Sequence, residues 1–279
     1  MSDQDLIVQQ ASAPAARLIL LFHGVGSRPE DLVPLGRLLA EADPGAWVVS
    51  VRSPDPGDLG GGWQWFSVRG VTEDSRPARI AEAMPSFVRQ VRDWQARVAV
   101  DAAATTLVGF SQGAIMALES TQLPETVAAR VISIAGRFAL PPRVAPANTQ
   151  VHLLHGEQDP VIDARYSLMA AETMQALGAA VSVELFPDLG HGVDARVAGR
   201  VKALAACVAR RCSMEHGCGS EQRARKRKNP PLRVGFHAFS VPRGTRPTLA
   251  GSRRDIESMG RHTGIEPVTP GATIQCSTN

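Results

Sequence analysis

The sequence predicts an α/β fold in which a mostly parallel central sheet carries helices on both of its faces. Between residues 17 and 210, apolar runs of strand length alternate with segments that repeat apolar residues at helical spacing. The run at residues 17–22 (RLILLF) is continuously apolar, which is typical of a parallel strand covered on both faces. A glycine-flanked serine between a strand and a helix, at residues 105–119, adds a sharp turn to this alternation.

The predicted strands are short runs of β-branched and aliphatic residues that end at glycine, proline or polar turns. The first of them is expected at an edge of the sheet. In chain order the strands are expected at residues 5–10, 17–22, 47–51, 105–108, 131–135, 150–155 and 181–186.

The predicted helices repeat apolar residues every three or four positions along one face. The longest contains Pro85, which either kinks the helix or begins its main part. Pro44 and Gly45 end the first helix. The helices are expected at residues 31–42, 79–98, 114–119, 164–177 and 194–210.

Residues 52–72 form a long loop rich in proline and glycine, and loops of this length in a compact domain are usually functional. The loop contains three aromatic residues in four positions, Trp63, Trp65 and Phe66. Lining a pocket and packing the loop onto the body of the protein are both consistent with this cluster.

Composition indicates one substantial domain followed by a segment of different character. The chain has 279 residues, of which 44% are hydrophobic, enough to bury one core. Residues 212–279 hold 11 of the 30 basic and 5 of the 27 acidic residues, so residues 1–211 have 19 basic and 22 acidic ones. We therefore expect a folded domain over residues 1–211, with no nucleic-acid partner, and a basic, disordered tail over residues 212–279.

The end of the tail, GIEPVTPGATIQCSTN, reads like the antisense translation of a transfer-RNA gene. Our hypothesis is that residues 212–279 are a frameshift or read-through product. The coding DNA tests it, because the hypothesis requires a transfer-RNA gene that overlaps the end of this reading frame.

Targeting and metal-binding signals are weak. The N-terminus (MSDQD) lacks a basic segment, and the first apolar run is too short for a signal peptide or a membrane span. The spacing of Cys207, Cys212 and Cys218 lacks the paired cysteines of structural zinc sites. We therefore expect a cytoplasmic protein without a membrane span, metal or cofactor.

Residues 105–119 (TTLVGFSQGAIMALE) predict a nucleophile elbow around Ser111. The serine of such an elbow sits in a strained turn between a strand and a helix, with its hydroxyl projecting. Side chains at Gly109 and Gly113 would collide with the neighbouring strand and helix. A five-residue match also occurs by chance in ordinary turns, so the prediction depends on the flanking strand and helix.

A serine hydroxyl is a weak nucleophile and needs a base that a carboxylate orients. In this context the acid and then the histidine follow Ser111 along the chain. His191 follows a predicted strand and lies between two glycines, and Asp159 follows another; Glu157 and Asp163 are the alternatives to Asp159. The predicted triad is Ser111, Asp159 and His191. The remaining histidines lie within strands, before turns, in the tail or in another part of the site: His23, His152, His155, His216, His237 and His262.

Charge that develops on a carbonyl oxygen during acyl transfer requires two fixed backbone donors. One is expected to be the N–H of Gln112, directly after the serine. The second is expected to be the N–H of Val25, in the glycine-containing loop (HGVG) that also holds His23 and Gly24. An ordinary strand-to-helix turn would also need glycines, so the HGVG pattern alone does not identify the donor. The prediction is stronger because the HGVG loop and the Ser111 turn both fit an oxyanion hole.

Five segments together resemble the phospholipase/carboxylesterase family, which includes acyl-protein thioesterases, and most of all its bacterial esterase branch. They are LFHGVG at 21–26, QWFSVRGVTED at 64–74, LVGFSQGAIMALES at 107–120, HGEQDPVID at 155–163 and DLGH at 188–191. The resemblance covers residues 5–210 and implies an α/β-hydrolase fold.

The resemblance also implies roles for individual residues. Ser111 matches the family nucleophile, Asp159 the acid and His191 the base, and Val25 and Gln112 match the oxyanion-hole positions. Trp65 and Phe66 match the loop that walls the acyl side of the cleft. Ser67, directly after Trp65 and Phe66, stands where the family often has aspartate, so the family's contacts at that position do not carry over to this chain.

Together these observations predict a serine esterase that hydrolyses carboxylic esters of small or medium acyl chains through an acyl-enzyme. Its substrate is a small-molecule ester or thioester, and it is a monomer or homodimer. The predicted pocket consists of His23, Gly24, Trp65 and Phe66. An acyl-thioesterase or lysophospholipase would use the same triad. A nucleic-acid-binding protein that uses the basic tail is the alternative of another class, and an intact triad argues against it.

Overall fold

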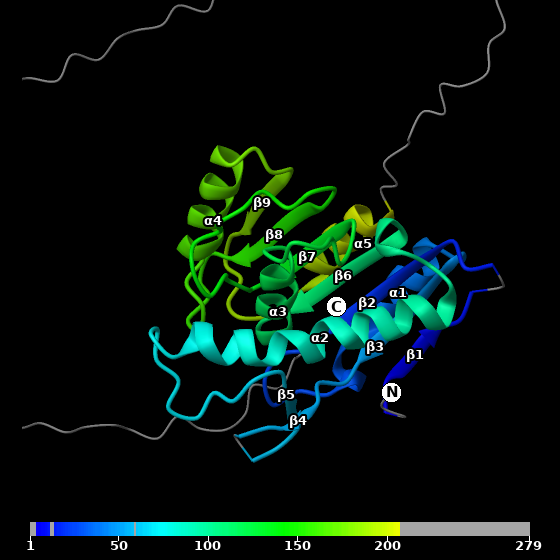
Figure 1. Cartoon of the computed structure of the whole chain (residues 1–279), viewed down its shortest axis with the longest axis horizontal. Coiled ribbons are helices and arrows are strands. Elements are labelled where there is room, and N and C mark those ends of the chain that lie inside the picture. Colours follow the sequence, from blue (N-terminus) through cyan, green and yellow to red (C-terminus); the bar gives the residue numbers. More distant parts are fainter. Residues whose placement is uncertain (1–3, 12–13, 59, 207–279) are drawn as a thin grey trace, which may run out of the picture. The chain divides into compact units, whose positions relative to one another are not determined.

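The computed structural model describes residues 4–11, 14–58 and 60–206, which form the predicted α/β-hydrolase fold (Figure 1). A seven-stranded sheet has the order β1-β3-β2-β6-β7-β8-β9. Strand β1 pairs antiparallel with β3, and every other pairing in this sheet is parallel. The strands are β1 (Leu6–Gln9), β2 (Arg17–Phe22), β3 (Ala46–Val51), β6 (Thr105–Phe110), β7 (Arg130–Ile134), β8 (Gln150–Gly156) and β9 (Val181–Phe186).

Helices cover both faces of the sheet, as predicted. Helices α2, α3 and α4 share one hydrophobic core with the sheet, and α2 crosses in front of the strands in Figure 1. Helices α1 and α5 share a second core on the opposite face. Their bounds are α1 (Val33–Ala42), α2 (Arg76–Val98), α3 (Gln112–Ser120), α4 (Arg165–Ala176) and α5 (Ala195–Ala206), with 3₁₀ turns η1 (Pro29–Leu32) and η2 (Ala102–Ala104).

Strand β2 shows why a continuous apolar run indicates a strand covered on both faces. Leu18, Leu20 and Phe22 belong to the core under α2 and α3. Ile19 and Leu21 point the other way and belong to the core under α1 and α5. Because successive side chains of a strand alternate between faces, both faces need apolar residues when both are covered.

The structure differs from the prediction in the segment between β3 and α2. The expected loop contains a short antiparallel hairpin whose strands, β4 (Asp55–Pro56) and β5 (Trp63–Gln64), have two residues each. Helix α2 begins at Arg76, three residues earlier than predicted, with a proline in its first turn, where the missing N–H costs nothing. Pro85 lies inside α2, so the alternative that the main helix begins there is wrong.

The predicted tail at residues 212–279 and the end of the last predicted helix lie outside the described residues. Within the described part of the chain, no helix is long and apolar enough to cross a membrane.

Two helical glycines make matched test positions for how tightly α3 packs on the sheet. A Cβ at Gly113 would lie 2.2 Å from the backbone oxygen of Phe22, whereas a Cβ at Gly199 in α5 would have no neighbour within 4 Å. We expect Gly113→Ala to lower the free energy of unfolding by about 2 kcal/mol or more, because backbone must move. Gly199→Ala should raise it by about 0.5–1 kcal/mol, because alanine favours a helix.

Urea unfolding of both variants beside the unsubstituted protein measures this difference. Equal stabilities for the two alanine variants would contradict the packing described for α3.

Candidate active site

Ser111 lies in a strained turn between the central strand β6 and helix α3. Its backbone has φ 51° and ψ −114°, a conformation that a non-glycine residue rarely adopts. The turn is fixed on both sides: the N–H of Ser111 donates to the carbonyl of Ile134 in β7 (2.9 Å), and the carbonyl of Ser111 accepts from Ile115 in α3 (3.0 Å). Such a conformation persists only where its surroundings over-determine it.

The glycines around Ser111 are required by close approach, as the sequence predicted. A Cβ at Gly109 would lie 2.5 Å from Cα of Ala114, and one at Gly113 would meet the Phe22 carbonyl of strand β2. Both contacts are with backbone, so no side-chain movement relieves them. The GxSxG pattern therefore reflects the close packing of helix α3 onto strands β6 and β2.

The structure brings the predicted nucleophile, base and acid into one hydrogen-bonded chain. His191 follows β9, and its Nε2 lies 2.9 Å from Ser111 Oγ. Its Nδ1 lies 2.7 Å from Oδ2 of Asp159, which follows β8. An ionised carboxylate only accepts hydrogen bonds, so Nδ1 carries the proton and Nε2 is left to accept from the serine hydroxyl. The His191 ring also packs against Phe110, with centroids 5.1 Å apart.

Asp159 is a buried and fully hydrogen-bonded carboxylate. Oδ1 accepts from the N–H groups of Val161 (2.8 Å) and Ile162 (2.9 Å), and Oδ2 accepts from His191. Burial by itself would raise the pKa of Asp159, but the hydrogen bonds from His155, His191 and the two backbone N–H groups outweigh it. They hold the pKa well below its ordinary value, so the side chain stays ionised.

The two alternatives to Asp159 are occupied elsewhere or exposed. Asp163 accepts from the N–H of Arg165 (2.8 Å) at the start of α4, and its side chain is exposed. Glu157 is exposed, and its carboxylate has no hydrogen-bond partner among the described residues.

His155 is a supporting residue that the sequence reasoning missed. It is buried at the end of β8, and its Nε2 donates to the carbonyl of Ile162 (2.7 Å) while lying 3.2 Å from Asp159 Oδ2. Its Nδ1 pairs with the hydroxyl of Ser167 (2.7 Å). His155 thus fixes the loop that carries the acid. The available signal was a histidine at a strand end, four residues before a candidate acid.

The two predicted oxyanion donors lie beside Ser111 and are free to donate. Val25 and Gln112 both line the cleft that contains Ser111. Among the described residues, neither backbone N–H has a hydrogen-bond acceptor. A Cβ at Gly24 would lie 3.3 Å from Cβ of Ser111, so the loop that carries Val25 packs against the elbow.

His23 and Trp65, which the sequence predicted to line the pocket, are instead buried beneath it. Nδ1 of His23 donates to the Gly24 carbonyl (2.7 Å), and Nε2 accepts from the N–H of Ser53 (3.2 Å). Burial lowers the pKa of His23 and keeps it neutral. The indole of Trp65 donates to the His23 carbonyl (2.8 Å) and meets Phe22 edge-on. His23, Gly24 and Trp65 therefore lie beneath the cleft and do not line it.

The side chain of Gln112 links the loop that carries Trp65 and Phe66 to the turn at Ser111 by hydrogen bonds, a role that no sequence pattern indicated. Its Oε1 accepts from the N–H of Trp65 (2.8 Å), and its Nε2 donates to the carbonyl of Phe66 (2.7 Å). Phe66 is the one predicted pocket residue that lines the cleft.

The cleft above Ser111 has a volume of about 460 Å³. Its apolar lining includes Val25, Phe66, Val68, Val71, Ile115 and Ile162. Among the described residues, no group of three or more His, Cys, Asp or Glu side chains is arranged to hold a metal ion.

Comparison with known proteins gives one consistent result. The model of the Phospholipase/Carboxylesterase family matches residues 3–206. Esterase YpfH from Escherichia coli (strain K12) is 45% identical over 196 residues, which cover 70% of this chain and 84% of that protein.

Two solved structures show a similar fold. Esterase PE8 has a TM-score of 0.65 at 27% identity, over 72% of this chain and 96% of that chain. The carboxylesterase from Bacillus cereus has a TM-score of 0.61 at 19% identity, over 72% of this chain and 92% of that chain, a likeness of fold alone.

The hydrogen bonds to Asp159 predict a pH-dependent contribution to stability. Because its folded-state pKa is depressed, the carboxylate contributes stability that is present above the unfolded-state pKa of about 3.9 and is lost as pH falls toward the folded-state pKa. Asp159→Asn should therefore lower the free energy of unfolding by about 1–3 kcal/mol at pH 7, and by less at each step below about pH 4.

Urea unfolding at pH 7, 5 and 3.5 measures this difference, with Asp163→Asn as the exposed control that should cost less at pH 7. A deficit of Asp159→Asn that stays constant over this range would contradict the assignment.

Proposed function

Because this chain belongs to the phospholipase/carboxylesterase family and is a carboxylic ester hydrolase, we propose that it cleaves esters through the triad Ser111, His191 and Asp159 and an acyl-enzyme intermediate. One observation carries the proposal: the continuous hydrogen-bonded chain from Ser111 Oγ through His191 to a buried, ionised Asp159. It supports a nucleophile, a base and an orienting acid in the order that acyl transfer needs.

In the first step, Ser111 Oγ attacks the ester carbonyl carbon while His191 Nε2 takes the hydroxyl proton. Asp159 stabilises the resulting imidazolium and keeps the ring in place. The bond between the carbonyl carbon and the alkoxy oxygen then breaks, and His191 gives its proton to the leaving alcohol. The product of this half-reaction is Ser111 acylated on Oγ.

In the second step, a water molecule attacks the acyl carbon while His191 takes one of its protons. The acid leaves, and Ser111 Oγ regains its proton from His191. In both steps the carbonyl oxygen becomes an oxyanion, for which the free N–H groups of Val25 and Gln112 are the proposed donors. By mutational precedent one such donor lowers the barrier by about 2.7–4 kcal/mol.

The size and lining of the cleft favour an ester with a small or medium acyl chain. Its volume of about 460 Å³ lies in the usual range for small-molecule sites, and its apolar wall suits hydrocarbon. An acyl-thioesterase or lysophospholipase would use the same machinery. Turnover of acyl-CoA, lysolipid and simple esters at matched concentration distinguishes the three.

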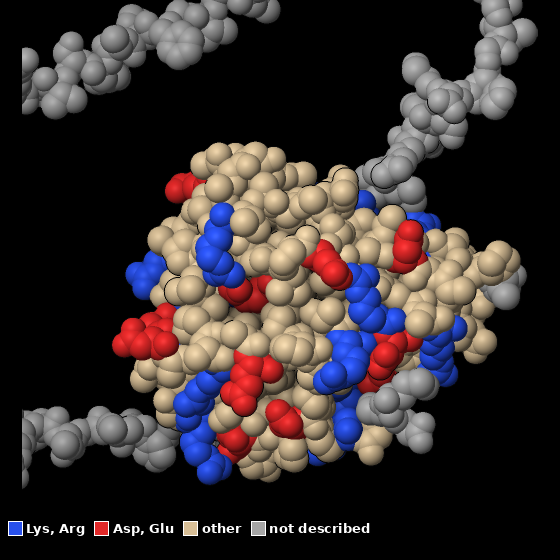
Figure 2. All heavy atoms as spheres, viewed as in Figure 1, with Lys and Arg blue, Asp and Glu red and all other residues tan. Residues whose placement is uncertain are grey.

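The described domain shows no feature that favours nucleic acid as a substrate or partner on the face drawn in Figure 2. Basic and acidic side chains are interspersed over this face and form no continuous basic stripe. A cytoplasmic location and a monomeric or homodimeric state stay predictions from the sequence.

Ser111→Ala tests the proposed nucleophile. We expect kcat on a short-chain chromogenic ester to fall by about 10⁴-fold or more, because no other group at this position attacks the carbonyl. The variant should stay folded and unfold at a similar urea concentration, because alanine keeps the same backbone and removes only the hydrogen bond from Oγ to His191, worth about 0.5–1.5 kcal/mol. Ser182→Ala, on β9 beside His152, is the matched control and should retain activity. Substantial turnover by a folded Ser111→Ala protein would overturn the proposal.

A further inference from the structure

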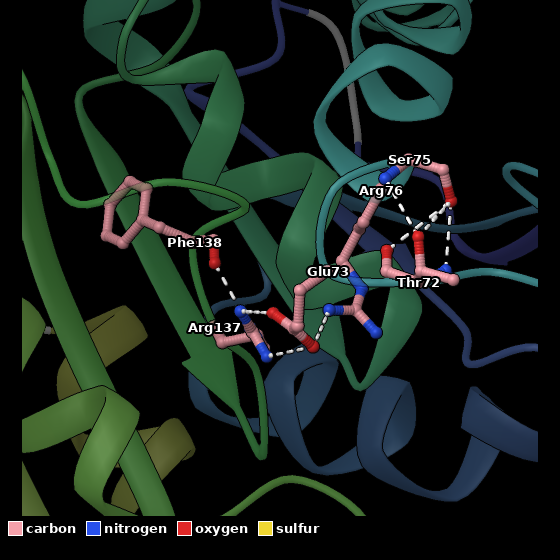
Figure 3. A network of polar contacts seen from close by, with 6 residues as sticks. All are labelled: Thr72, Glu73, Ser75, Arg76, Arg137 and Phe138. Carbon is pink, nitrogen blue, oxygen red and sulfur yellow. Dashed lines mark hydrogen bonds and ion pairs between the residues drawn. The ribbon is translucent and has the colours of Figure 1, made fainter.

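Arg76, Arg137 and Glu73 line the same cleft as Ser111. Figure 3 shows the polar network that these three residues form. Arg137 follows β7, Arg76 begins α2, and Glu73 belongs to the loop before α2. The Glu73 carboxylate lies between the two guanidinium groups. Arg137 donates to it twice, from Nη1 (3.2 Å) and Nη2 (2.7 Å), and Arg76 donates to it from Nη1.

Arg137 is fixed by the body of the protein and not by Glu73 alone. Only 10% of its side chain is exposed, and its guanidinium stacks 3.9 Å from the ring centroid of Tyr166 in α4. Its Nε donates to the carbonyl of Phe138 (3.2 Å). The preceding strand end, at Ile134, accepts the backbone N–H of Ser111. A buried, planar pair of donors is therefore held in the cleft, three residues after a strand end that is hydrogen-bonded to Ser111.

Glu73, which accepts the hydrogen bonds from Nη1 and Nη2 of Arg137, is in contrast mostly exposed. Its side chain is 62% exposed. Hydrogen bonds from Arg137 and Arg76 lower its pKa, so it is ionised. The carboxylate thus binds to a charged site from the solvent side, in the way that a carboxylate ligand would.

The loop that carries Glu73 is held by other contacts. Asp58 Oδ2 accepts from the Ser67 hydroxyl (2.6 Å) and from the N–H groups of Val68 (2.8 Å) and Arg69 (3.1 Å). Arg79 donates to the carbonyls of Ser67 and Arg69, each at 2.9 Å. Anchoring of the loop therefore does not require the carboxylate of Glu73.

The cluster carries more positive charge than Glu73 neutralises. Two guanidinium groups share one carboxylate, and within the described part of the chain the guanidinium of Arg76 donates only through Nη1. The cleft has three further charged residues: Arg165 and Asp163 pair with each other (3.5 Å), and the charge of Asp159 is taken up by its hydrogen bonds from His191 and two backbone N–H groups. Within the cluster of Arg76, Glu73 and Arg137, one positive charge and the remaining guanidinium donors of Arg76 are thus left for an anion.

We propose that Arg76 and Arg137 form a subsite for a carboxylate carried by the ester substrate, and that Glu73 occupies this subsite in the free enzyme. This inference rests on the proposed function, because its ligand is part of the ester that Ser111 attacks. The substrate class it names is the half-ester of a short dicarboxylic acid. Arg137 supplies the planar fork that matches a carboxylate, and Arg76 supplies the second charge.

The test compares monoethyl adipate with ethyl hexanoate, which has a six-carbon acyl chain of the same length without the second carboxylate. Ethanol release gives kcat/KM for each ester, and the ratio of the anionic to the neutral value reports the subsite. Arg76→Gln should lower this ratio about tenfold, the effect of losing one charged hydrogen-bonding partner. Glu73→Gln should raise it several-fold, because the internal competitor is gone.

Arg137→Lys keeps the charge but loses the two-pronged geometry, so the ratio should fall in that variant as well. Glu184→Gln removes the carboxylate that Arg200 Nε contacts (2.5 Å), on β9 and away from the cleft, and is the matched control with an unchanged ratio.

Ratios within twofold of the unsubstituted enzyme in both Arg76→Gln and Glu73→Gln would overturn the inference. A loss of activity on both esters alike in Glu73→Gln would also overturn it, because that is the signature of a loop anchor. Hydrolysis of ethyl hexanoate by the unsubstituted enzyme, and its loss in Ser111→Ala, report the proposed function separately from the subsite.

Discussion

The strained backbone of Ser111 is the constraint on which the site depends. A residue with φ 51° is held there by a hydrogen bond to β7 and by the first turn of α3. Gly109 and Gly113 let that helix approach the strands so closely that no Cβ fits. This packing costs conformational freedom, which the two hydrophobic cores offset. In return, the serine hydroxyl is presented at the end of the central strand, where the loops of neighbouring strands reach it.

The parallel sheet explains how residues far apart in sequence serve one serine. The loops after β2, β7, β8 and β9 leave the same edge of the sheet as the elbow, because these strands are parallel to β6 and lie on either side of it. The loop after β2 brings Val25, the loop after β7 brings Arg137, and the loops after β8 and β9 bring Asp159 and His191. Each of these loops thus contributes a residue to the proposed site.

Local sequence patterns predicted the fold and the members of the hydrogen-bonded chain around Ser111, because each strand, turn and strand-end loop that carries them has a short-range signal of its own. A continuous apolar run identifies a covered strand, and GxSxG identifies a close packing of strand, turn and helix. The pocket was harder to predict, because an aromatic or imidazole side chain is equally suited to a cleft wall and to a core. Trp65 and His23 are in the core, since each completes a buried hydrogen bond there. The contact of Glu73 with Arg137 joins distant segments, so no local pattern contains it. His155 lies only four residues before Asp159, but a histidine before a turn glycine is equally typical of an ordinary strand end.

The central claim is that folding makes the hydroxyl of Ser111 nucleophilic, and labelling by a fluorophosphonate probe tests it most directly. Tandem mass spectrometry of the labelled protein locates the adduct, and the same protein unfolded in urea before labelling is the control. The structure predicts one adduct, on Ser111, that forms in the folded protein and is absent from the unfolded one. An adduct on another residue with Ser111 unmodified, or equal labelling of folded and unfolded protein, would contradict the account.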